Sequence, residues 1–147
     1  MLCPGCVMHA IPQARQVHEL YADQGVAMIG LHTVFEHHDA MTPTALAAFL
    51  HEYRIPFPVG VDQPDGHGGI PHTMRAYAMR GTPTLVLIDA AGNLRHQHFG
   101  SVADLTLGAQ IAALVLEARE AASVAATAGP AQAAQGCASG ACPVDTK

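Results

Sequence analysis

YAMRGTPTLVLIDAAG, residues 77–92, joins a Gly-Thr-Pro-Thr turn to a short apolar run and then to a second turn. The run LVLI, residues 85–88, is typical of a buried β-strand, and a proline directly before it donates no hydrogen bond there. If the Thr82–Pro83 bond is cis, the backbone of Thr82 faces outward and can pair with an extended peptide. The segment therefore predicts a strand that begins at an open backbone edge.

Two cysteines lie one helical turn apart at the start of the chain, in the motif Cys3-Pro4-Gly5-Cys6. The free amides and the dipole of a helix N-terminus stabilise a thiolate on its first residue, so such a pair can pass a disulfide back and forth. The same spacing also serves as half of a zinc site. The motif alone therefore leaves redox chemistry and metal binding both open.

Taken together, the two motifs resemble the thioredoxin-like superfamily, most closely its TlpA-type and AhpC/TSA-type redoxins. The resemblance is carried by Tyr77-x-Met79-x-Gly81-Thr82-Pro83-Thr84-x-x-Leu87-Ile88-Asp89-x-x-Gly92, with Cys-x-x-Cys ahead of it, and it covers roughly residues 1–116. It implies an α/β thioredoxin-like fold with an inserted helix-strand unit and a central mixed sheet flanked by helices. It also implies thiol-disulfide exchange without a cofactor or metal.

The resemblance assigns roles to four residues. Cys3 is expected to be the attacking thiol, because a thiol at a helix start has a lowered pKa, and Cys6 is expected to resolve the mixed disulfide. Thr82 and Pro83 are expected to contact the backbone of the substrate. The expected partner is a protein or small molecule that carries a thiol or disulfide, with an unknown thiol reductant upstream; the direction of electron flow stays open.

The remaining chain fits this fold as alternating helices and strands. We expect a helix from Pro4 to about Tyr21, kinked at Pro12 because an interior proline removes one backbone hydrogen bond. The other expected elements are a buried strand over 26–34, a helix over 43–54 capped by Thr42, an extended piece over 56–61, a short helix over 70–79, strands over 84–88 and 94–99, and a helix over about 104–122.

The N-terminal end departs from the family pattern. In a thioredoxin-like fold a central strand leads into the Cys-x-x-Cys helix, but only Met1 and Leu2 precede Cys3. A late start or a fragment is favoured over a domain without that strand, since a sheet lacking an interior strand leaves two rows of backbone groups unpaired. The predicted organisation is a thioredoxin-like domain over 1–120, its first strand missing or truncated, and a flexible Ala/Gly-rich tail over 121–147.

The tail carries a second cysteine pair, Cys137 and Cys142. Two thiols on a flexible arm can reach a distant site, so these cysteines are candidates for a shuttle dithiol that exchanges with the first pair. The alternative is a tail without any part in catalysis. The sequence does not decide between them.

Composition restricts the classes of function. The chain has 147 residues, half of them hydrophobic, which suits one ordinary core, and its formal net charge of -5 with seven Lys plus Arg argues against nucleic-acid or anionic-membrane partners. No apolar run reaches the length needed to cross a bilayer, and no secretory signal is visible. We therefore expect a cytoplasmic protein, although a longer N-terminus would leave room for an export signal.

Two other functions stay open at this point. The first is a thiol-dependent peroxidase of the AhpC/TSA kind, for which Arg95 is a weak candidate as the supporting arginine. The second is zinc binding by the two cysteine pairs, with His37-His38 or His96-x-His98 as further metal ligands. The ten histidines show no ligand spacing linked to either cysteine pair, which favours the redox interpretation.

Overall fold

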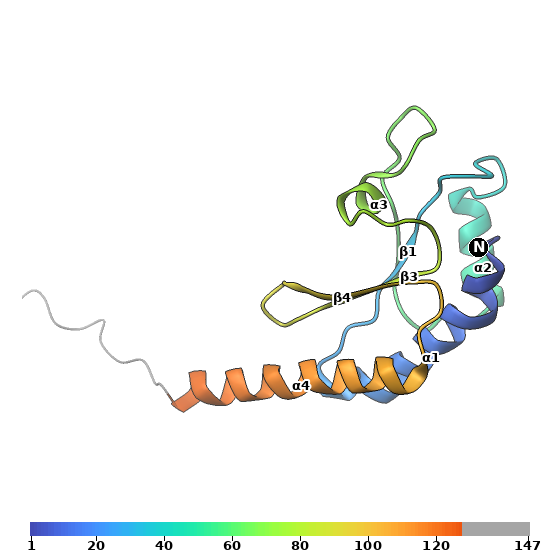
Figure 1. Cartoon of the computed structure of the whole chain (residues 1–147). Coiled ribbons are helices and arrows are strands. Elements are labelled where there is room, and N and C mark those ends of the chain that lie inside the picture. Colours follow the sequence, from blue (N-terminus) through green and yellow to red (C-terminus); the bar gives the residue numbers. More distant parts are fainter. Residues whose placement is uncertain (128–147) are drawn as a thin grey trace, which may run out of the picture.

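The computed structural model describes residues 1–127, in which four α-helices surround two pairs of strands (Figure 1). The helices are α1 (Ile11–Tyr21), α2 (Pro43–Glu52), α3 (His72–Ala76) and α4 (Asp104–Thr127), and the strands are β1 (Gly30–His32), β2 (Val59–Val61), β3 (Thr84–Ile88) and β4 (Leu94–Phe99). Cys137 and Cys142 lie outside the described residues. No helix within residues 1–127 is long and apolar enough to cross a membrane.

The strands form two separate two-stranded sheets. β1 and β2 pair in parallel, with Gly30 opposite Val59, whereas β3 and β4 pair antiparallel, with Thr84 opposite Phe99. The bounds of β3 and β4 agree with the strands predicted over 84–88 and 94–99, because the apolar run LVLI and the Asp-Ala-Ala-Gly turn mark this hairpin locally. The pair β1–β2 belongs to the inserted helix-strand unit, with α2 as its crossover.

An apolar slot separates the two sheets. The slot is a cavity of about 860 Å³, lined by β1 on one side and β3 on the other, by the N-terminal helix, and by Leu107 and Ile111 of α4. The expected single mixed sheet is therefore split, and the strand predicted over 26–34 is reduced to β1. β1 is short because β2 pairs with only one of its edges. The backbone groups at the other edge have no strand partner within residues 1–127.

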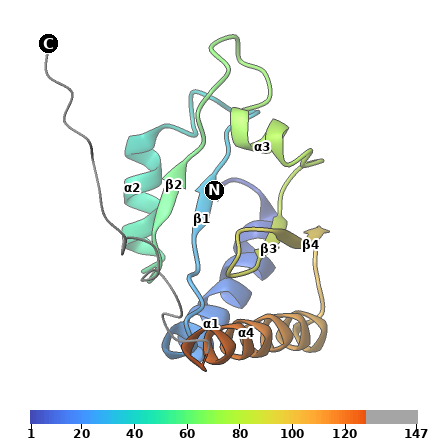
Figure 2. The ribbon, with the colours of Figure 1, turned by 90° about the vertical axis from the view of Figure 1, so that its left-hand side faces the viewer.

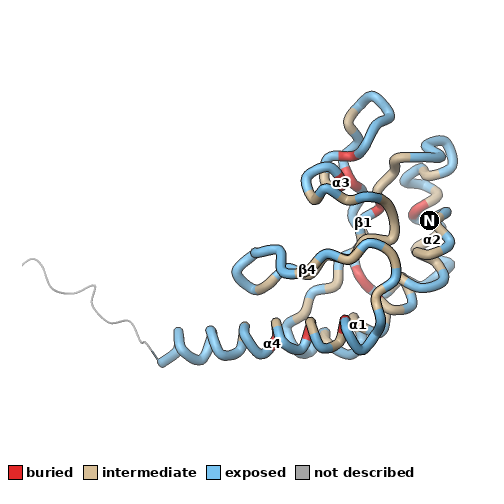
Figure 3. The backbone as a smooth tube through the Cα atoms, viewed as in Figure 1, coloured by how far each residue is buried: buried red, intermediate tan, exposed pale blue. Residues whose placement is uncertain are grey.

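The core lies where α4 packs against α1 and the hairpin. Leu107, Ile111 and Val115 recur along one face of α4 and are buried against Val17 and Leu85, among others. Both views show α1 and α4 side by side below the strands (Figure 2). The outer part of α4 is exposed (Figure 3), and the helix continues to residue 127, so residues 121–127, predicted to be tail, are helical.

Helix ends follow local sequence signals. The N-terminal helix begins at Pro4 and contains a π-helical turn, Cys6–Ala10, in which the Ile11 amide donates to the Cys6 carbonyl. This wider turn accommodates Pro12, which has no amide hydrogen to continue the normal pattern. The Oγ1 of Thr42 accepts a hydrogen bond from the third residue of α2, as the predicted cap requires. α3 is shorter than the predicted helix over 70–79 and ends before a positive φ at residue 78.

Candidate active site: a cysteine pair beside the Thr82–Pro83 turn

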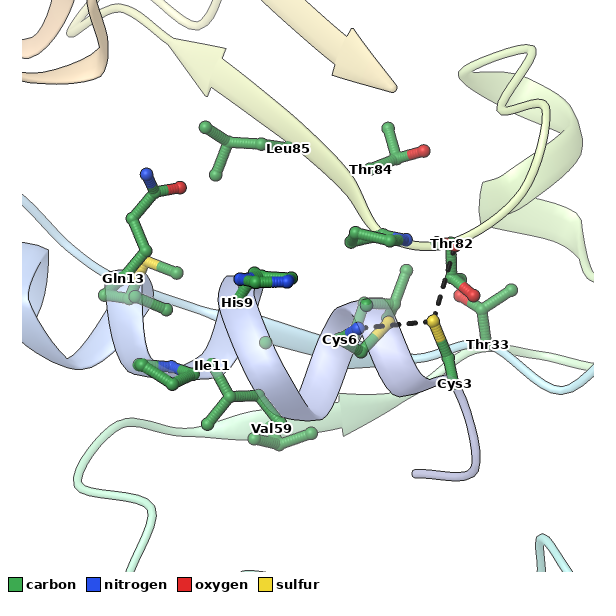
Figure 4. A pocket seen from close by; sticks show the side chains of 18 of the residues that line it. Cys3, Cys6, His9, Ile11, Gln13, Thr33, Val59, Thr82, Thr84 and Leu85 are labelled. Carbon is green, nitrogen blue, oxygen red and sulfur yellow. Dashed lines mark hydrogen bonds between the residues drawn. The ribbon is translucent and has the colours of Figure 1, made fainter. Parts of the chain in front are cut away.

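The first cysteine and the Gly-Thr-Pro-Thr turn meet in space. The Sγ of Cys3 donates a hydrogen bond to the carbonyl oxygen of Thr82 at 3.4 Å, although the two residues are 79 positions apart in the chain (Figure 4). The Thr82–Pro83 peptide bond is cis. The helix N-terminus brings Cys3 to this point, and the start of β3 brings Thr82. The structure thus brings together all four predicted site residues, Cys3, Cys6, Thr82 and Pro83.

Gly5, inside the cysteine motif, allows the helix to approach the turn closely. A Cβ atom built on Gly5 would lie 3.2 Å from the Cδ of Pro83 and 3.9 Å from the Sγ of Cys3. The first distance is tighter than ordinary van der Waals contact, so a larger residue would push the turn away from the thiol. Glycine is needed here for space and not for conformation, because its φ of -62° lies in the helical region that any residue can adopt.

The helix start makes Cys3 the more acidic thiol. The backbone amide of Cys6 donates to the Sγ of Cys3 at 3.3 Å, which stabilises a negative charge on that sulfur. Partial burial raises the pKa of Cys3, but hydrogen bonds from the Cys6 thiol, the Thr82 side chain and the amides of Cys6 and Gly5 outweigh it. The net result is a pKa below the ordinary thiol value. Cys3 is therefore the better nucleophile of the pair at neutral pH.

Cys6 has the opposite character. Burial, together with the hydrogen bond to Cys3 and the charge on that thiolate, raises the pKa of Cys6 to about 11. Both cysteines are free thiols in the structure, and both are partly buried. When the pair loses one proton, the negative charge therefore lies on Cys3 and the remaining proton on Cys6.

Solved structures of other proteins match this chain. The crystal structure of a thioredoxin-like superfamily protein is 66% identical in sequence, with a TM-score of 0.74 over 78% of this chain and 73% of that protein. This chain belongs to the thioredoxin-like superfamily. The fold predicted for this thioredoxin-like chain is thereby confirmed.

Two further neighbours of the thioredoxin-like chain have names that describe activities. A thiol-disulfide isomerase from Corynebacterium glutamicum is 48% identical, with a TM-score of 0.76, over 78% of this chain and 74% of that one. A thiol:disulfide interchange protein, DsbE, from Chlorobium tepidum is 29% identical, with a TM-score of 0.59, over 77% of this chain and 72% of that one. No protein-family model and no curated protein matches the chain.

Arg95 and the His96–His98 pair, considered above for other chemistries, lie on the β3–β4 hairpin, whereas His37 lines the same pocket as Cys3. Arg95 forms ion pairs with Glu117 and Asp89 near the tip of the β3–β4 hairpin, so its guanidinium is engaged there and does not support Cys3. The rings of His96 and His98 stack 6.3 Å apart, and His98 is hydrogen-bonded to a glutamine. Within residues 1–127 no group of three or more His, Cys, Asp or Glu side chains is placed to hold a metal ion.

Two residues near the site did not stand out in the sequence. Thr33 follows β1 and lines the same pocket as Cys3 and Thr82 (Figure 4). Asp62 follows β2 and is 4% exposed, and its carboxylate accepts a hydrogen bond from Thr33. The sequence offers no signal for a buried carboxylate here, because Asp62 opens an Asp- and Gly-rich stretch over 62–69 that predicts only a loop.

Proposed function

We propose that this chain is a thiol-disulfide oxidoreductase in which Cys3 and Cys6 exchange a disulfide with a protein or small-molecule partner. The observation that carries the proposal is the position of the Cys3 Sγ, 3.4 Å from the Thr82 carbonyl oxygen, where an extended peptide can lie along the start of β3. The names of two neighbours, a thiol-disulfide isomerase and a thiol:disulfide interchange protein, support the same class of reaction.

In the first step the Cys3 thiolate attacks one sulfur of the substrate disulfide. A bond forms between Cys3 and that sulfur as the substrate disulfide breaks, and the second substrate sulfur leaves as a thiolate that takes up a proton from water. The backbone of Thr82 and the ring of Pro83 would hold the peptide on either side of the reacting sulfur. The Cys6 amide, 3.3 Å from the Cys3 Sγ, keeps the attacking sulfur charged until this step.

In the second step Cys6 releases the substrate. Once Cys3 is bonded to the substrate it carries no charge and no longer acts on Cys6, which removes two of the causes that raise the Cys6 pKa to about 11. Cys6 then loses its proton and attacks the Cys3 sulfur, forming the Cys3–Cys6 disulfide as the mixed disulfide breaks. The substrate has gained two electrons and two protons, and the cysteine pair has lost them. The reverse sequence oxidises a substrate dithiol.

The proposal is tested by turnover. The chain, with dithiothreitol as reductant, should reduce a disulfide-containing peptide faster than dithiothreitol alone, and Cys3→Ser should abolish that difference. A matched control is Ser123→Ala, which removes a hydroxyl from an exposed position on the outer part of α4, away from the cysteine pocket. Equal rates with and without the chain would reject the function.

The domain organisation and location belong to the same proposal. We propose that the domain over 1–120 is completed by a further strand in the slot between β1 and β3, whose facing edges are both unpaired. Met1 and Leu2 line this slot, so a strand leading into Met1 would enter it directly. A cytoplasmic location, and exchange of Cys137 and Cys142 with the first pair, stay predictions from the sequence.

The zinc and peroxidase alternatives have direct tests. A protein purified without chelator should contain no stoichiometric zinc under the proposed function, whereas one equivalent would favour a cysteine-ligated ion. Consumption of hydrogen peroxide with dithiothreitol should not exceed that of free dithiothreitol. No residue described in 1–127 favours either alternative over disulfide exchange.

A further inference from the structure

A buried carboxylate joins the parts of the fold that carry the active site. Asp62 is 4% exposed, and its Oδ1 accepts the backbone amide of Thr73 at 2.9 Å. Its Oδ2 accepts the amide of Met74 at 3.0 Å and the hydroxyl of Thr33 at 3.3 Å. These partners are all neutral, so the carboxylate is held by directed hydrogen bonds and not by an ion pair.

One side of this cluster reaches the wall of the cysteine pocket. The amide of Asp62 donates to the carbonyl of His32, the last residue of β1, at 3.0 Å. The next residue, Thr33, donates its hydroxyl to the carboxylate and lines the pocket with Cys3 and Thr82 (Figure 4). The backbone amide of Asp62 thereby holds the end of β1, and its carboxylate orients the Thr33 side chain.

The other side of the cluster holds the segment that leads into the Thr82–Pro83 turn. α3 has only one turn, and Asp62 binds its first two free amides, those of Thr73 and Met74. Met74 is buried, and its carbonyl accepts the amide of Met79 at 2.9 Å, three residues before Thr82. Asp62 therefore helps to anchor a short segment whose far end is the turn facing Cys3.

We propose that Asp62 is a positioning residue, which holds Thr33 and the Thr82–Pro83 turn in place around the Cys3 thiol. The inference rests on the proposed function in one respect: it requires Cys3 to be the nucleophile of disulfide exchange. Asp62 does not touch the thiol itself. It acts through Thr33, after β1, and through α3, which leads by Met79 into the turn. Thr33 and the turn both line the pocket, and no other polar side chain bonds to both segments among the described hydrogen bonds.

The ionised state of Asp62 is essential to this role. Burial raises the pKa of Asp62, but hydrogen bonds from Thr73, Met74 and Thr33 outweigh it and keep the pKa below the ordinary value. An asparagine has the same shape but offers one acceptor oxygen, and its NH₂ group would face an amide hydrogen. Asp62→Asn should therefore lose the hydrogen bond from one of the two α3 amides, Thr73 or Met74, and loosen α3 without creating a cavity.

The test measures the Cys3 thiolate in Asp62→Asn. The thiolate is followed by its ultraviolet absorbance against pH and by the pH dependence of alkylation with iodoacetamide. We expect the pKa of Cys3 to rise by about half a unit or more, which is roughly a threefold loss of thiolate below the pKa. We also expect KM for a disulfide peptide to rise more than kcat falls, because the displaced turn binds the peptide backbone poorly.

Asp89→Asn is the matched control. Asp89 also accepts backbone amides, those of Ala91 and Asn93, but it does so in the hairpin turn and has no connection to α3. Its variant should leave the Cys3 pKa and KM unchanged. An Asp62→Asn protein that is folded and has the wild-type Cys3 pKa would overturn the inference, as would equal effects in both variants.

If the Asp62→Asn protein does not fold, Thr33→Val is the second test of the proposed role. Valine keeps the volume of threonine and removes only the hydroxyl that binds Asp62. The Cys3 pKa should rise in the same direction by a smaller amount, and an unchanged pKa would contradict the proposed role. Failure of the proposed function gives a different result, because wild-type Cys3 would then titrate like a free thiol and the chain would not reduce the peptide.

Discussion

Replacement of Cys6 by alanine should raise the pKa of Cys3. The Cys6 thiol is among the groups that hold the Cys3 thiolate, together with the Cys6 amide, which survives the substitution. A hydrogen bond to a charged group contributes about 1.5–3 kcal/mol, and a thiol is a weak donor at a partly exposed site, so about 0.7–1.4 kcal/mol is reasonable. Since 1.36 kcal/mol corresponds to one pKa unit, the expected rise is about 0.5–1 unit.

Cys6→Ser is the control for this prediction, because its hydroxyl can still donate to the Cys3 thiolate. Thiolate absorbance against pH should give a Cys3 pKa in Cys6→Ala that lies about 0.5–1 unit above the value in Cys6→Ser. Both variants keep the helix amide and remove the second titrating thiol, so the difference reports the side-chain hydrogen bond alone. Equal pKa values in the two variants, or a lower value with alanine, would refute the assignment of that hydrogen bond.

Three other outcomes can be checked separately. Gly5→Ala should lower peptide reduction by several-fold to about tenfold without unfolding the chain, because its Cβ would lie 3.2 Å from the proline ring; unchanged kcat/KM would contradict this. Leu107→Ala should cost about 2–5 kcal/mol in chemical denaturation, since Leu107 is 2% exposed, whereas Leu105→Ala, at a position 90% exposed, should change stability by less than about 0.5 kcal/mol. If Cys137 and Cys142 exchange with the first pair, partial oxidation should give disulfide-linked peptides that join the two pairs, and finding only local disulfides by mass spectrometry would reject the shuttle.

Strong local signals explain why much of the fold could be predicted. The hairpin over 84–88 and 94–99 has a continuous apolar run and a defined turn. Thr42 is followed by proline at the helix start, and the apolar positions of α4 recur at helical spacing. Each of these signals acts within a few residues. Elements whose extent depends on a distant partner were predicted less well, and β1 is three residues long where nine were expected, because one of its edges is unpaired.

The site shows the same division between local and distant causes. The motif at Cys3 predicted a redox or metal site and the turn at Thr82 predicted an open backbone edge, and the structure places the Cys3 Sγ 3.4 Å from the Thr82 carbonyl oxygen. The function of Asp62 depends on amides and a hydroxyl from two other segments, which no pattern in the sequence connects. The high pKa of Cys6 likewise depends on burial and on its neighbour, neither of which can be read from spacing.

The central claim is that Cys3 attacks and Cys6 resolves. The most direct measurement is trapping of the first intermediate: Cys6→Ser is incubated with a disulfide-containing peptide, alkylated and digested, and the site of the mixed disulfide is found by mass spectrometry. The proposed roles predict one peptide adduct, on Cys3, which accumulates because no resolving thiol follows it. An adduct that forms instead on Cys137 or Cys142, with Cys3 alkylated and free, would contradict them.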